Sequence, residues 1–280
     1  MTVKPLLKLA LCRGTDCPTG SSIWVAPLWK NHDFLRLLVS GPDDLAQRPG
    51  CEVLPTVPNT TVLRMPCLDN TLYFKYFKAE TEWGRIRAMW RGSRAYRAWQ
   101  GARLLLEHGL NTPEVVAIAE CKGTGRGNFS LLVTLEISGI PLRTYLREQQ
   151  LAPGRQARLA SALGLEIARL HGCCITHGDL HPGNVLVEEK GKQGFSFAYL
   201  DTERVSKPGT KLNRHIIKDL SLLNHPNLGY ISQRARLCFL KAYVQANSGL
   251  GDTARVLLRD IEQASAKRYG RKTEFSKGSA

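Results

Sequence analysis

The residues best suited to chemistry in this sequence lie in one short segment. Between a predicted helix and two predicted short strands runs His177-Gly178-Asp179-Leu180-His181-Pro182-Gly183-Asn184. A second carboxylate, Asp201, directly follows the predicted strand that ends in Tyr199-Leu200. Phosphoryl transfer requires a carboxylate that orients the attacking hydroxyl and accepts its proton, together with oxygen ligands for Mg²⁺. Asp179 suits the first role, and Asn184 and Asp201 offer the hard oxygens that Mg²⁺ prefers.

A lysine upstream completes the set of groups that this reaction needs. The runs Thr61–Met65 and Thr71–Phe77 are rich in β-forming residues and are predicted to form a hairpin. On the second strand Tyr73, Lys75 and Phe77 share one face, because successive side chains of a strand alternate. An exposed strand lysine is the ordinary interpretation, but a lysine flanked by aromatic residues is less often merely solvated. Lys75 is therefore the candidate to bind the phosphates of a nucleotide.

The elements expected around these residues divide the chain into a strand-rich half and a helical half. The first sixty residues contain the short apolar runs Ile23–Val25 and Phe34–Val39, which we interpret as strands. Apolar spacing predicts helices over 93–108, 159–171, 216–223, 232–246 and 253–267, and short strands over 131–135, 185–187 and 197–200. We expect an α+β fold with two lobes, a strand-rich N-lobe over residues 1–136 and a mainly helical C-lobe over residues 137–280, with the active site between them.

Composition excludes several classes of protein. The chain has 280 residues and 43% hydrophobic content, which is enough for a sizeable core and excludes disorder of the bulk of the chain. No run of about 18 apolar residues predicts a spanning helix, and the short N-terminal apolar stretch is interrupted by Lys8, so we expect a cytoplasmic protein. The eight cysteines include no Cys-x-x-Cys pair, which disfavours a zinc site.

The charge of the chain indicates an anionic partner. Lys and Arg number 39 against 24 Asp and Glu, which gives a formal net charge of +15. Nucleic acid, a phosphorylated substrate or an acidic membrane face would each be attracted by this excess.

The pattern His-x-Asp-x-x-x-x-Asn, formed by His177, Asp179 and Asn184, resembles the catalytic loop of the protein-kinase-like superfamily. More narrowly, the sequence resembles the lipopolysaccharide core kinases, the Kdo/heptose sugar kinases of Gram-negative bacteria, over roughly residues 60–245. The stretches that carry the narrower resemblance are Leu72–Phe77, Ser93–Trp99, His108–Pro113, Ile175–Leu180, Tyr199–Arg204 and Lys218–Leu220.

This resemblance implies a protein-kinase-like fold and a role for each residue that matches the motif. Lys75 would contact the α- and β-phosphates of ATP, and Asp179 would be the catalytic base. Asn184 and Asp201 would hold Mg²⁺. His177 would brace the catalytic loop rather than react. The N-lobe would bind the nucleotide, and the C-lobe would bind metal and acceptor.

The resemblance also places the adenine site, and two features depart from the family pattern. Glu136 and Ile137 fall where the backbone of the hinge would meet adenine. The family usually has a glutamate on the first helix that pairs with the strand lysine, but here that position is Ala98. The acids that could substitute for it are Glu80, Glu82 and Glu107. No Gly-x-Gly-x-x-Gly precedes Lys75, and we interpret Gly123–Gly127 as a hairpin turn.

The chain after Asp201 bears on the acceptor. Only 79 residues follow it, without an Ala-Pro-Glu sequence, which favours a small molecule or a glycolipid over a protein. The first hypothesis is therefore an ATP-dependent kinase of a sugar hydroxyl, on Kdo or heptose, in the lipopolysaccharide inner core. The alternatives are another small-molecule phosphotransferase, an atypical protein kinase, or a kinase-like protein that binds without catalysis.

A basic and aromatic stretch is the candidate surface for the anionic partner. Its arginines alternate with aromatic residues, as the following list shows: Trp83, Arg85, Arg87, Trp90, Arg91, Arg94, Tyr96, Arg97, Trp99 and Arg103. A solvated helix face and attraction to anionic headgroups are equally compatible with this pattern. The tail 267–272 is also basic. We expect an anionic glycolipid or phosphorylated sugar acceptor and peripheral contact with the cytoplasmic face of the inner membrane, with nucleic acid ranked third.

Overall fold

The computed structural model describes residues 7–10, 21–78, 92–121, 129–191, 194–224, 231–247 and 254–276. The chain divides into two units, Met1–Ile137 and Ser138–Ala280, and each is treated by itself below. The division follows Ile137, one residue after the boundary expected from the sequence.

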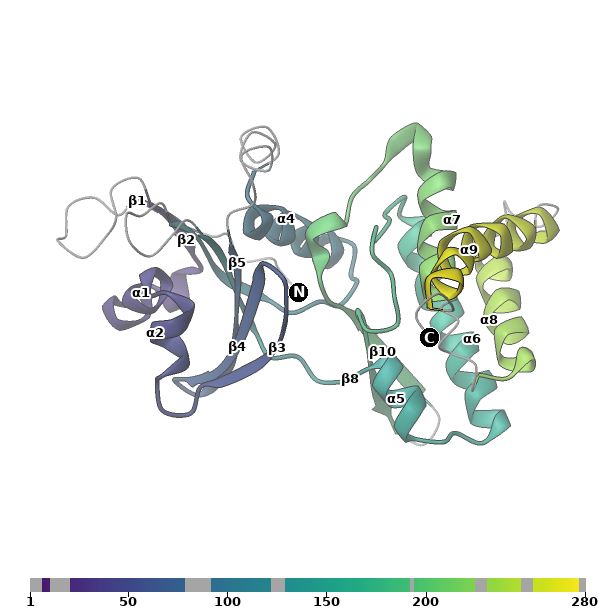
Figure 1. Ribbon diagram of the computed structural model, residues 1–280, viewed down its shortest axis with the longest axis horizontal. Helices are drawn as coiled ribbons and strands as arrows, with labels where there is room; N and C mark the ends of the chain where they lie inside the picture. Colours follow the sequence, from purple (N-terminus) through teal and green to yellow (C-terminus); the bar gives the residue numbers. More distant parts are fainter. Residues whose placement is uncertain are drawn as a thin grey trace. The chain divides into compact units, whose positions relative to one another are not determined.

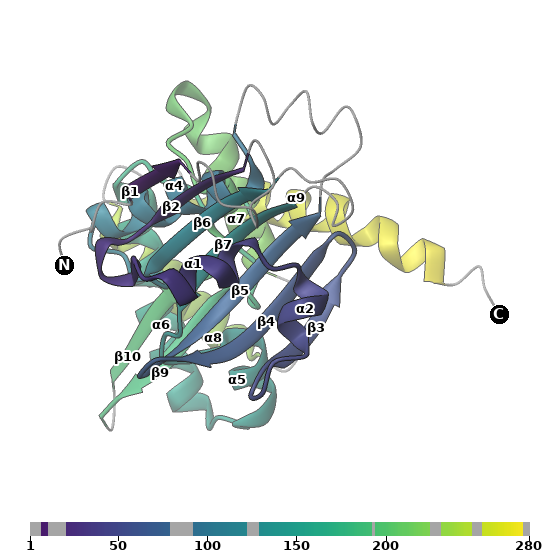
Figure 2. The same ribbon diagram turned by 90° about the vertical axis from the view of Figure 1, so that its left-hand side faces the viewer.

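The N-terminal unit is built on a seven-stranded antiparallel sheet, seen in Figure 2. Its strands lie in the order β1-β2-β6-β7-β5-β4-β3. Their bounds are β1 (Leu7–Ala10), β2 (Ser22–Val25), β3 (Glu52–Val57), β4 (Thr60–Cys67), β5 (Asn70–Lys78), β6 (Val115–Cys121) and β7 (Phe129–Leu135). The predicted hairpin is confirmed as β4 and β5, with Cys67 opposite Asn70. The predicted strands at 23–25 and 131–135 are β2 and β7.

Helices cover both faces of this sheet. Strand β7 places Leu131 and Val133 in one apolar cluster and Leu132 in another, as the alternation of a strand requires. The first cluster includes buried residues of α1 (His32–Val39) and α2 (Pro42–Ala46), and the second includes Ala95 and Ala98 of α4 (Arg94–Glu107). A short 3₁₀ helix, η1 (Pro27–Trp29), precedes α1.

One predicted strand of this unit is a helix. Residues Phe34–Val39 form the greater part of α1. The side chain of Asn31 accepts a hydrogen bond from the Phe34 backbone N–H at 2.8 Å and caps the helix. Phe34, Leu37 and Leu38 are all buried, and their i, i+3, i+4 spacing gives a helix one apolar face. A short apolar run is compatible with either element, and here the N-cap and this spacing favour the helix.

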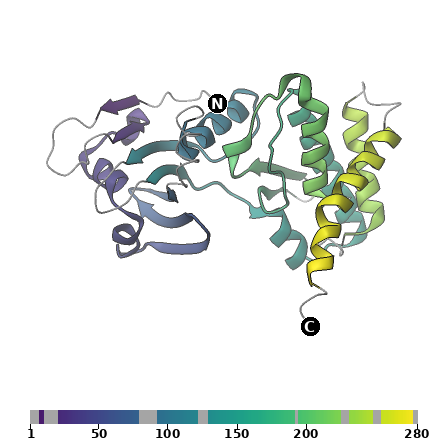
Figure 3. The same ribbon diagram turned by 45° about the horizontal axis from the view of Figure 1, so that its top comes forward.

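The C-terminal unit is mainly helical (Figures 1 and 3). Its helices are α5 (Leu142–Glu148), α6 (Pro153–Gly172), α7 (Leu212–Leu223), α8 (Gln233–Ala246) and α9 (Ala254–Ser276), with two 3₁₀ turns, η2 (Thr202–Arg204) and η3 (Gly209–Lys211). A small antiparallel sheet of β10 (Gly194–Tyr199), β9 (Val185–Lys190) and β8 (Ile140–Pro141) completes it. The four helices predicted here are confirmed, and α5 was not expected. None of the helices among the described residues is long and apolar enough to cross a membrane.

Candidate active site

The segment 177–184 lies in the C-terminal unit, between α6 and β9, and is anchored by a carboxylate from α7. The Asp219 side chain is fully buried. Its Oδ2 accepts the His177 backbone N–H at 2.7 Å, and its Oδ1 accepts the Gly178 N–H at 2.9 Å. Such charge-assisted bonds compensate the cost of burying the carboxylate. Two adjacent backbone groups next to Asp179 are thereby fixed in place.

His177 joins this segment to the strand that leads to Asp201. Its Nε2 lies 2.9 Å from the carbonyl oxygen of Leu200. A carbonyl oxygen only accepts, so Nε2 carries the proton and donates. Complete burial lowers the pKa of His177, and nearby Asp219 opposes that shift. A buried, neutral imidazole in this position is suited to bracing the loop, as the resemblance implies.

Asn184 ties the two ends of the loop together. Its Nδ2 donates to the Asp179 carbonyl at 3.0 Å, and its own carbonyl accepts the Leu200 N–H at 2.8 Å. The amide nitrogen of Asn184 donates to Asp179, and its Oδ1, which carries lone pairs, is the side-chain atom that could bind a cation.

Asp201 follows β10 in an uncommon backbone conformation. Its φ of 58° and ψ of 55° lie in the left-handed region, which residues with a side chain rarely adopt and which is often retained at functional sites. The residue is exposed. Asn184 and Asp201 therefore present two hard oxygen donors on segments joined by the Leu200 bonds. The described residues include no group of three or more His, Cys, Asp and Glu that could hold a metal by itself. A pair of oxygens fits Mg²⁺, which binds through one or two protein ligands, water and substrate phosphates.

The carboxylate of Asp179 is half-buried and is surrounded by titratable groups of the same unit. Burial lowers the pKa of His181 and Lys218 and raises the pKa of Tyr269, and the negative charge of Asp179 acts to raise all three. The preceding glycine is required by the backbone: Gly178 has φ of +75°, and a Cβ on it would lie 2.8 Å from the Arg204 carbonyl oxygen. The structure thus brings four predicted residues into one unit: His177, Asp179, Asn184 and Asp201.

The other predicted residues lie in the N-terminal unit. Lys75 is in the middle of β5, opposite Leu132 of β7, so it shares the face of the sheet against which α4 packs. Its Nζ lies 5.4 Å from the centre of the Phe77 ring. Ala98 is buried on that same face, so the helix supplies no acid there. Glu107 forms an ion pair with Arg103 at 3.2 Å on the exposed end of α4. Glu80 and Glu82 lie outside the described residues.

Glu136 and Ile137 end the N-terminal unit. The Glu136 carboxylate accepts from Arg64 Nε and from the Tyr73 hydroxyl, each at 3.0 Å, and the Arg64 hydrogen bond is the main cause of its lowered pKa. The Glu136 backbone N–H donates to the Thr71 carbonyl at 2.9 Å. Any contact of Glu136 with adenine is therefore left to its backbone carbonyl.

The basic stretch is engaged locally where the structure describes it. Arg94 lies 4.5 Å from the centre of the Phe77 ring, Arg97 donates to the Gly92 carbonyl at 2.9 Å, and Arg103 pairs with Glu107. Tyr96 packs against Trp24 and Trp99, with ring centres 6.3 and 5.4 Å apart. Trp83, Arg85, Arg87, Trp90, Arg91 and the Gly123–Gly127 segment lie outside the described residues.

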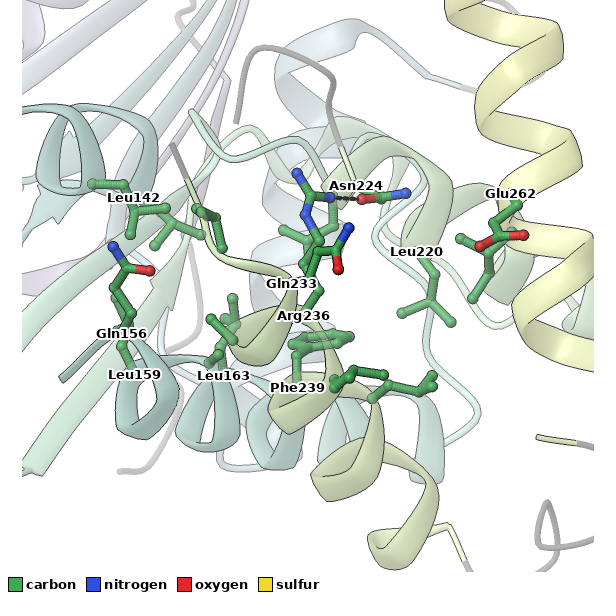
Figure 4. A pocket seen from close by; sticks show the side chains of 18 residues that line it. Leu142, Gln156, Leu159, Leu163, Leu220, Asn224, Gln233, Arg236, Phe239 and Glu262 are labelled. Carbon is green, nitrogen blue, oxygen red and sulfur yellow. Dashed lines mark hydrogen bonds between the residues drawn. The ribbon is translucent and has the colours of Figure 1, made fainter. Parts of the chain in front are cut away.

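An apolar cavity of about 510 Å³ lies among the helices of the C-terminal unit. Its wall includes Leu159 and Leu163 of α6, Leu220 of α7 and Phe239 of α8, as Figure 4 shows. Arg236 and Asn224 are hydrogen-bonded to each other at its edge. None of the residues predicted for phosphoryl transfer lines it.

Comparison with known proteins assigns the chain to a family. The pattern of the lipopolysaccharide kinase (Kdo/WaaP) family matches residues 65–243, which is more than half of the sequence. The chain belongs to this family. Among solved structures, WaaP in complex with acyl carrier protein is similar, with a TM-score of 0.61 and 22% identity over 86% of this chain and 95% of that one. This likeness shows the fold, which is kinase-like. No curated protein matches the sequence.

Membership of the Kdo/WaaP family confirms the resemblance and the fold class predicted from the sequence. The matched range contains Lys75, the loop 177–184, Asp201 and also Asp219, which the sequence analysis did not single out. The stretch Lys218–Leu220 carried part of the resemblance, but nothing in it indicated that Asp219 is the partner of His177 and Gly178.

Proposed function

We propose that the chain is an ATP- and Mg²⁺-dependent kinase that phosphorylates a sugar hydroxyl, on Kdo or heptose, of the lipopolysaccharide inner core. The observation that supports this most directly is the buried network around Asp179. Asp219, His177 and Asn184 hold the loop and the Asp201 segment through five hydrogen bonds between 2.7 and 3.0 Å. A protein that only binds would not need the oxygen-bearing side chains of Asp179, Asn184 and Asp201 together in this arrangement.

The C-terminal unit would carry the chemical step. Asp179 would accept a hydrogen bond from the acceptor hydroxyl, orient its oxygen and take its proton. Asn184 Oδ1 and the Asp201 carboxylate would hold Mg²⁺. ATP would supply the phosphoryl group, and the metal would neutralise the negative charge on that group during transfer. His177 stays neutral and has its Nε2–H committed to Leu200, so it would position the loop and take no part in proton transfer.

The N-terminal unit would bind the nucleotide. Lys75 would contact the α- and β-phosphates, and the backbone of Glu136 and Ile137 would meet adenine. With Ala98 in place of an acid, Lys75 would be held by the sheet and by Phe77 rather than by an ion pair from α4. The strand register makes this workable, because β4 and β7 fix β5 on both sides.

The assignment is tested by transfer of labelled phosphate from ATP. Purified protein is offered inner-core oligosaccharide, small alcohols and a protein mixture. Asp179→Asn should reduce transfer to the oligosaccharide by about 10²–10⁴-fold, the usual contribution of a general base. Asp43→Asn, an equal charge change at an exposed position of α2, should leave it unchanged. Preferred transfer to alcohols or proteins would favour the alternative acceptors.

The non-enzymatic alternative is tested in the same protein without turnover. ATP with Mg²⁺ should raise the melting temperature of the wild type, because a ligand that binds only the folded state stabilises it. Lys75→Met should diminish this rise. If neither transfer nor a nucleotide-dependent shift is found, the chain is a kinase-like binding protein. Contact with the cytoplasmic face of the inner membrane is tested by sedimentation with vesicles of anionic phospholipid.

A second candidate function follows from the cavity of the C-terminal unit. WaaP has been seen in complex with acyl carrier protein, and an apolar cavity of about 510 Å³ suits an acyl chain. We propose that this chain also binds an acylated acyl carrier protein. Ala160→Trp, which adds a large ring at the cavity wall, should weaken binding of the acylated form. Binding that is equally strong without the acyl chain, or unaffected by Ala160→Trp, would contradict this proposal.

A further inference from the structure

Four cationic residues of the C-terminal unit converge on the loop that carries Asp179. Each comes from a different element: Arg143 from α5, Arg204 from η2, Lys218 from α7 and Arg268 from α9. The sequence separates them by up to 125 positions, so no motif connects them.

Contacts with the backbone of the loop fix three of these residues next to it. Lys218 Nζ donates to the Gly178 carbonyl at 2.5 Å. The Arg204 backbone is packed on Gly178, with its carbonyl oxygen 2.8 Å from where a Cβ of that glycine would lie. At the other end of the loop, the Arg143 N–H donates to the Pro182 carbonyl at 3.0 Å. These three residues are therefore held next to the loop on both sides of Asp179 in the sequence: Lys218 and Arg204 at Gly178, and Arg143 at Pro182.

The fourth residue, Arg268, lies on α9, which packs against the helix that carries Lys218. Ser265, three residues before Arg268, donates through Oγ to the carbonyl of Ser221, three residues after Lys218, at 3.5 Å. Electrostatic effects agree with this placement. Burial lowers the pKa of Lys218, and Arg204 and Arg268 both lower it further. Burial raises the pKa of the adjacent Tyr269, and Arg268 and Arg143 oppose this increase. The three arginines thus act on Lys218 and Tyr269, the same side chains on which the Asp179 carboxylate acts.

The cluster has more positive than negative charge. Three carboxylates also act on these side chains: Asp179, Asp201 and the buried Asp219, whose two oxygens accept hydrogen bonds from the loop. Among the described residues, no carboxylate forms an ion pair with Arg204, Lys218 or Arg268. Positive charges at close range repel one another, and an anion bound among them offsets this repulsion. Arginine side chains are well shaped to bind a carboxylate or phosphate in a bidentate manner.

We propose that Arg143, Arg204, Lys218 and Arg268 form a binding site for an oxyanion on the acceptor, a sugar phosphate or sugar carboxylate next to the hydroxyl that reacts. The inference rests on the proposed kinase function and assigns the substrate recognition of that site to the C-terminal unit. It moves the expected anion-binding surface away from residues 85–103. The distribution of charge supports a site in the C-terminal unit. Ser138–Ala280 contains 22 Lys and Arg against 12 Asp and Glu, whereas Met1–Ile137 contains 17 Lys and Arg against 12 Asp and Glu.

The test compares Arg204→Gln and Arg268→Gln with a matched control. Arg259→Gln removes the same charge from the same helix as Arg268. It lies nine residues earlier, about 13 Å along the axis and on the opposite face. The ligands are deacylated inner-core oligosaccharide, its dephosphorylated form and its carboxyl-reduced form. Binding is measured by titration calorimetry with a non-hydrolysable ATP analogue at saturation, so that neither turnover nor the nucleotide site contributes.

Each of the two cluster variants should weaken binding of the native oligosaccharide about tenfold, while Arg259→Gln leaves it unchanged. If the two substitutions no longer affect binding of the dephosphorylated oligosaccharide, the anion is a phosphate. If they no longer affect binding of the carboxyl-reduced oligosaccharide, the anion is a carboxylate. In steady-state transfer the same variants should raise KM for the oligosaccharide and leave kcat and KM for ATP within about twofold. Equal losses for all three ligand forms, or for Arg259→Gln, would overturn the site. Anion-dependent binding without phosphate transfer would instead refute the proposed function and leave the site standing.

Discussion

The two units of this chain position their chemical groups by different physical means. In Met1–Ile137 the buried residues with polar side chains are Ser21, Thr60 and Thr112, among the residues described there, and Lys75 is placed by strand register. In Ser138–Ala280 the described buried polar residues include two histidines, an asparagine and the charged Asp219. Hydrogen bonds across long sequence separations place the loop there.

This difference predicts which unit tolerates substitutions better. An apolar core loses stability gradually when its volume is altered, and a strand keeps its register through many side chains. A buried charge that holds two backbone N–H groups is compensated only while every partner is present. We therefore expect the C-terminal unit to respond more sharply to conservative polar substitutions.

The largest effect is expected at Asp219. Asp219→Asn preserves shape, but its amide nitrogen must face one of the two N–H groups of His177 and Gly178. Breaking a buried charged interaction of this kind should lower the free energy of unfolding by about 3 kcal/mol or more, and phosphate transfer should be lost with it. The measurement is urea unfolding followed by far-UV circular dichroism, to which the helices of the C-terminal unit contribute most.

A matched substitution in the other unit makes the comparison direct. Thr60→Val is also isosteric and buried, but it removes only a 3.4 Å hydrogen bond from Arg94, so about 1 kcal/mol should be lost. All five tryptophans belong to the sequence of the N-terminal unit, so their fluorescence is used to follow the unfolding of that unit. Equal losses in the two variants would show that the contrast between the units is wrong.

A smaller effect is expected at Gly178. In Gly178→Ala the new Cβ must occupy a left-handed backbone conformation and approach the Arg204 carbonyl oxygen within 2.8 Å. Together these should cost about 2–3 kcal/mol of unfolding free energy. Gly191→Ala is the control: its φ is +64°, and nothing lies within 4 Å of the added Cβ, so only the conformational part, about 1 kcal/mol, should be lost. Thermal unfolding of both variants separates the contact with Arg204 from backbone strain.

The loop 177–184 and its partner Asp219 show which parts of the site could be predicted from the sequence. The helical unit, the hairpin of Lys75 and the loop 177–184 could be predicted because period, caps and spacing are local properties. Asp219 could not be assigned, since its partners lie about 40 positions away and only folding brings them together. The same holds for Arg143, Arg204, Lys218 and Arg268, whose cluster depends on four separate elements.

Ambiguous or missing local signals explain where the predicted elements differ from the structure. Phe34–Val39 is short and apolar, and such a run predicts a strand or a buried helix equally well until the Asn31 cap is taken into account. Helix α5 begins after Pro141 without a side-chain cap, so no start signal marks it. The basic stretch was interpreted from the alternation of its arginines with aromatic residues; where the structure describes it, Arg94, Arg97 and Arg103 make contacts within their own unit.

A pH-dependent effect of intermediate size is expected from His177. Its pKa is lowered in the folded protein by burial, so below about pH 6.5 the unfolded chain binds a proton that the folded chain does not. The free energy of unfolding should therefore fall as the pH is lowered from 7 to 5, by at most about 1.4 kcal/mol per pH unit for this group. In His177→Gln, whose amide can still donate to Leu200, the slope should be smaller. The half-buried His181, whose pKa is also lowered, would account for the remaining slope.

The control for this pH experiment comes from the other unit. His32 on α1 is 76% exposed in its side chain, and His32→Gln removes a solvated imidazole. The slope of stability against pH should not change. A slope that persists in His177→Gln but disappears in His32→Gln would show that the buried network of the C-terminal unit does not dominate the acid response.

The smallest effect is expected at Glu107, and its value lies in what it decides about Lys75. Glu107 is the one acid of α4, and its carboxylate is paired with exposed Arg103 rather than directed to the sheet. Exposed ion pairs of this i, i+4 type contribute about 0.3–0.5 kcal/mol, so Glu107→Gln should change stability by no more than that. KM for ATP should be unchanged, because register and Phe77 hold Lys75. A rise of tenfold or more in that KM would mean that Glu107 replaces the missing helix glutamate. The N-terminal unit would then also rely on a charged pair, and the contrast between the two units would lose its basis.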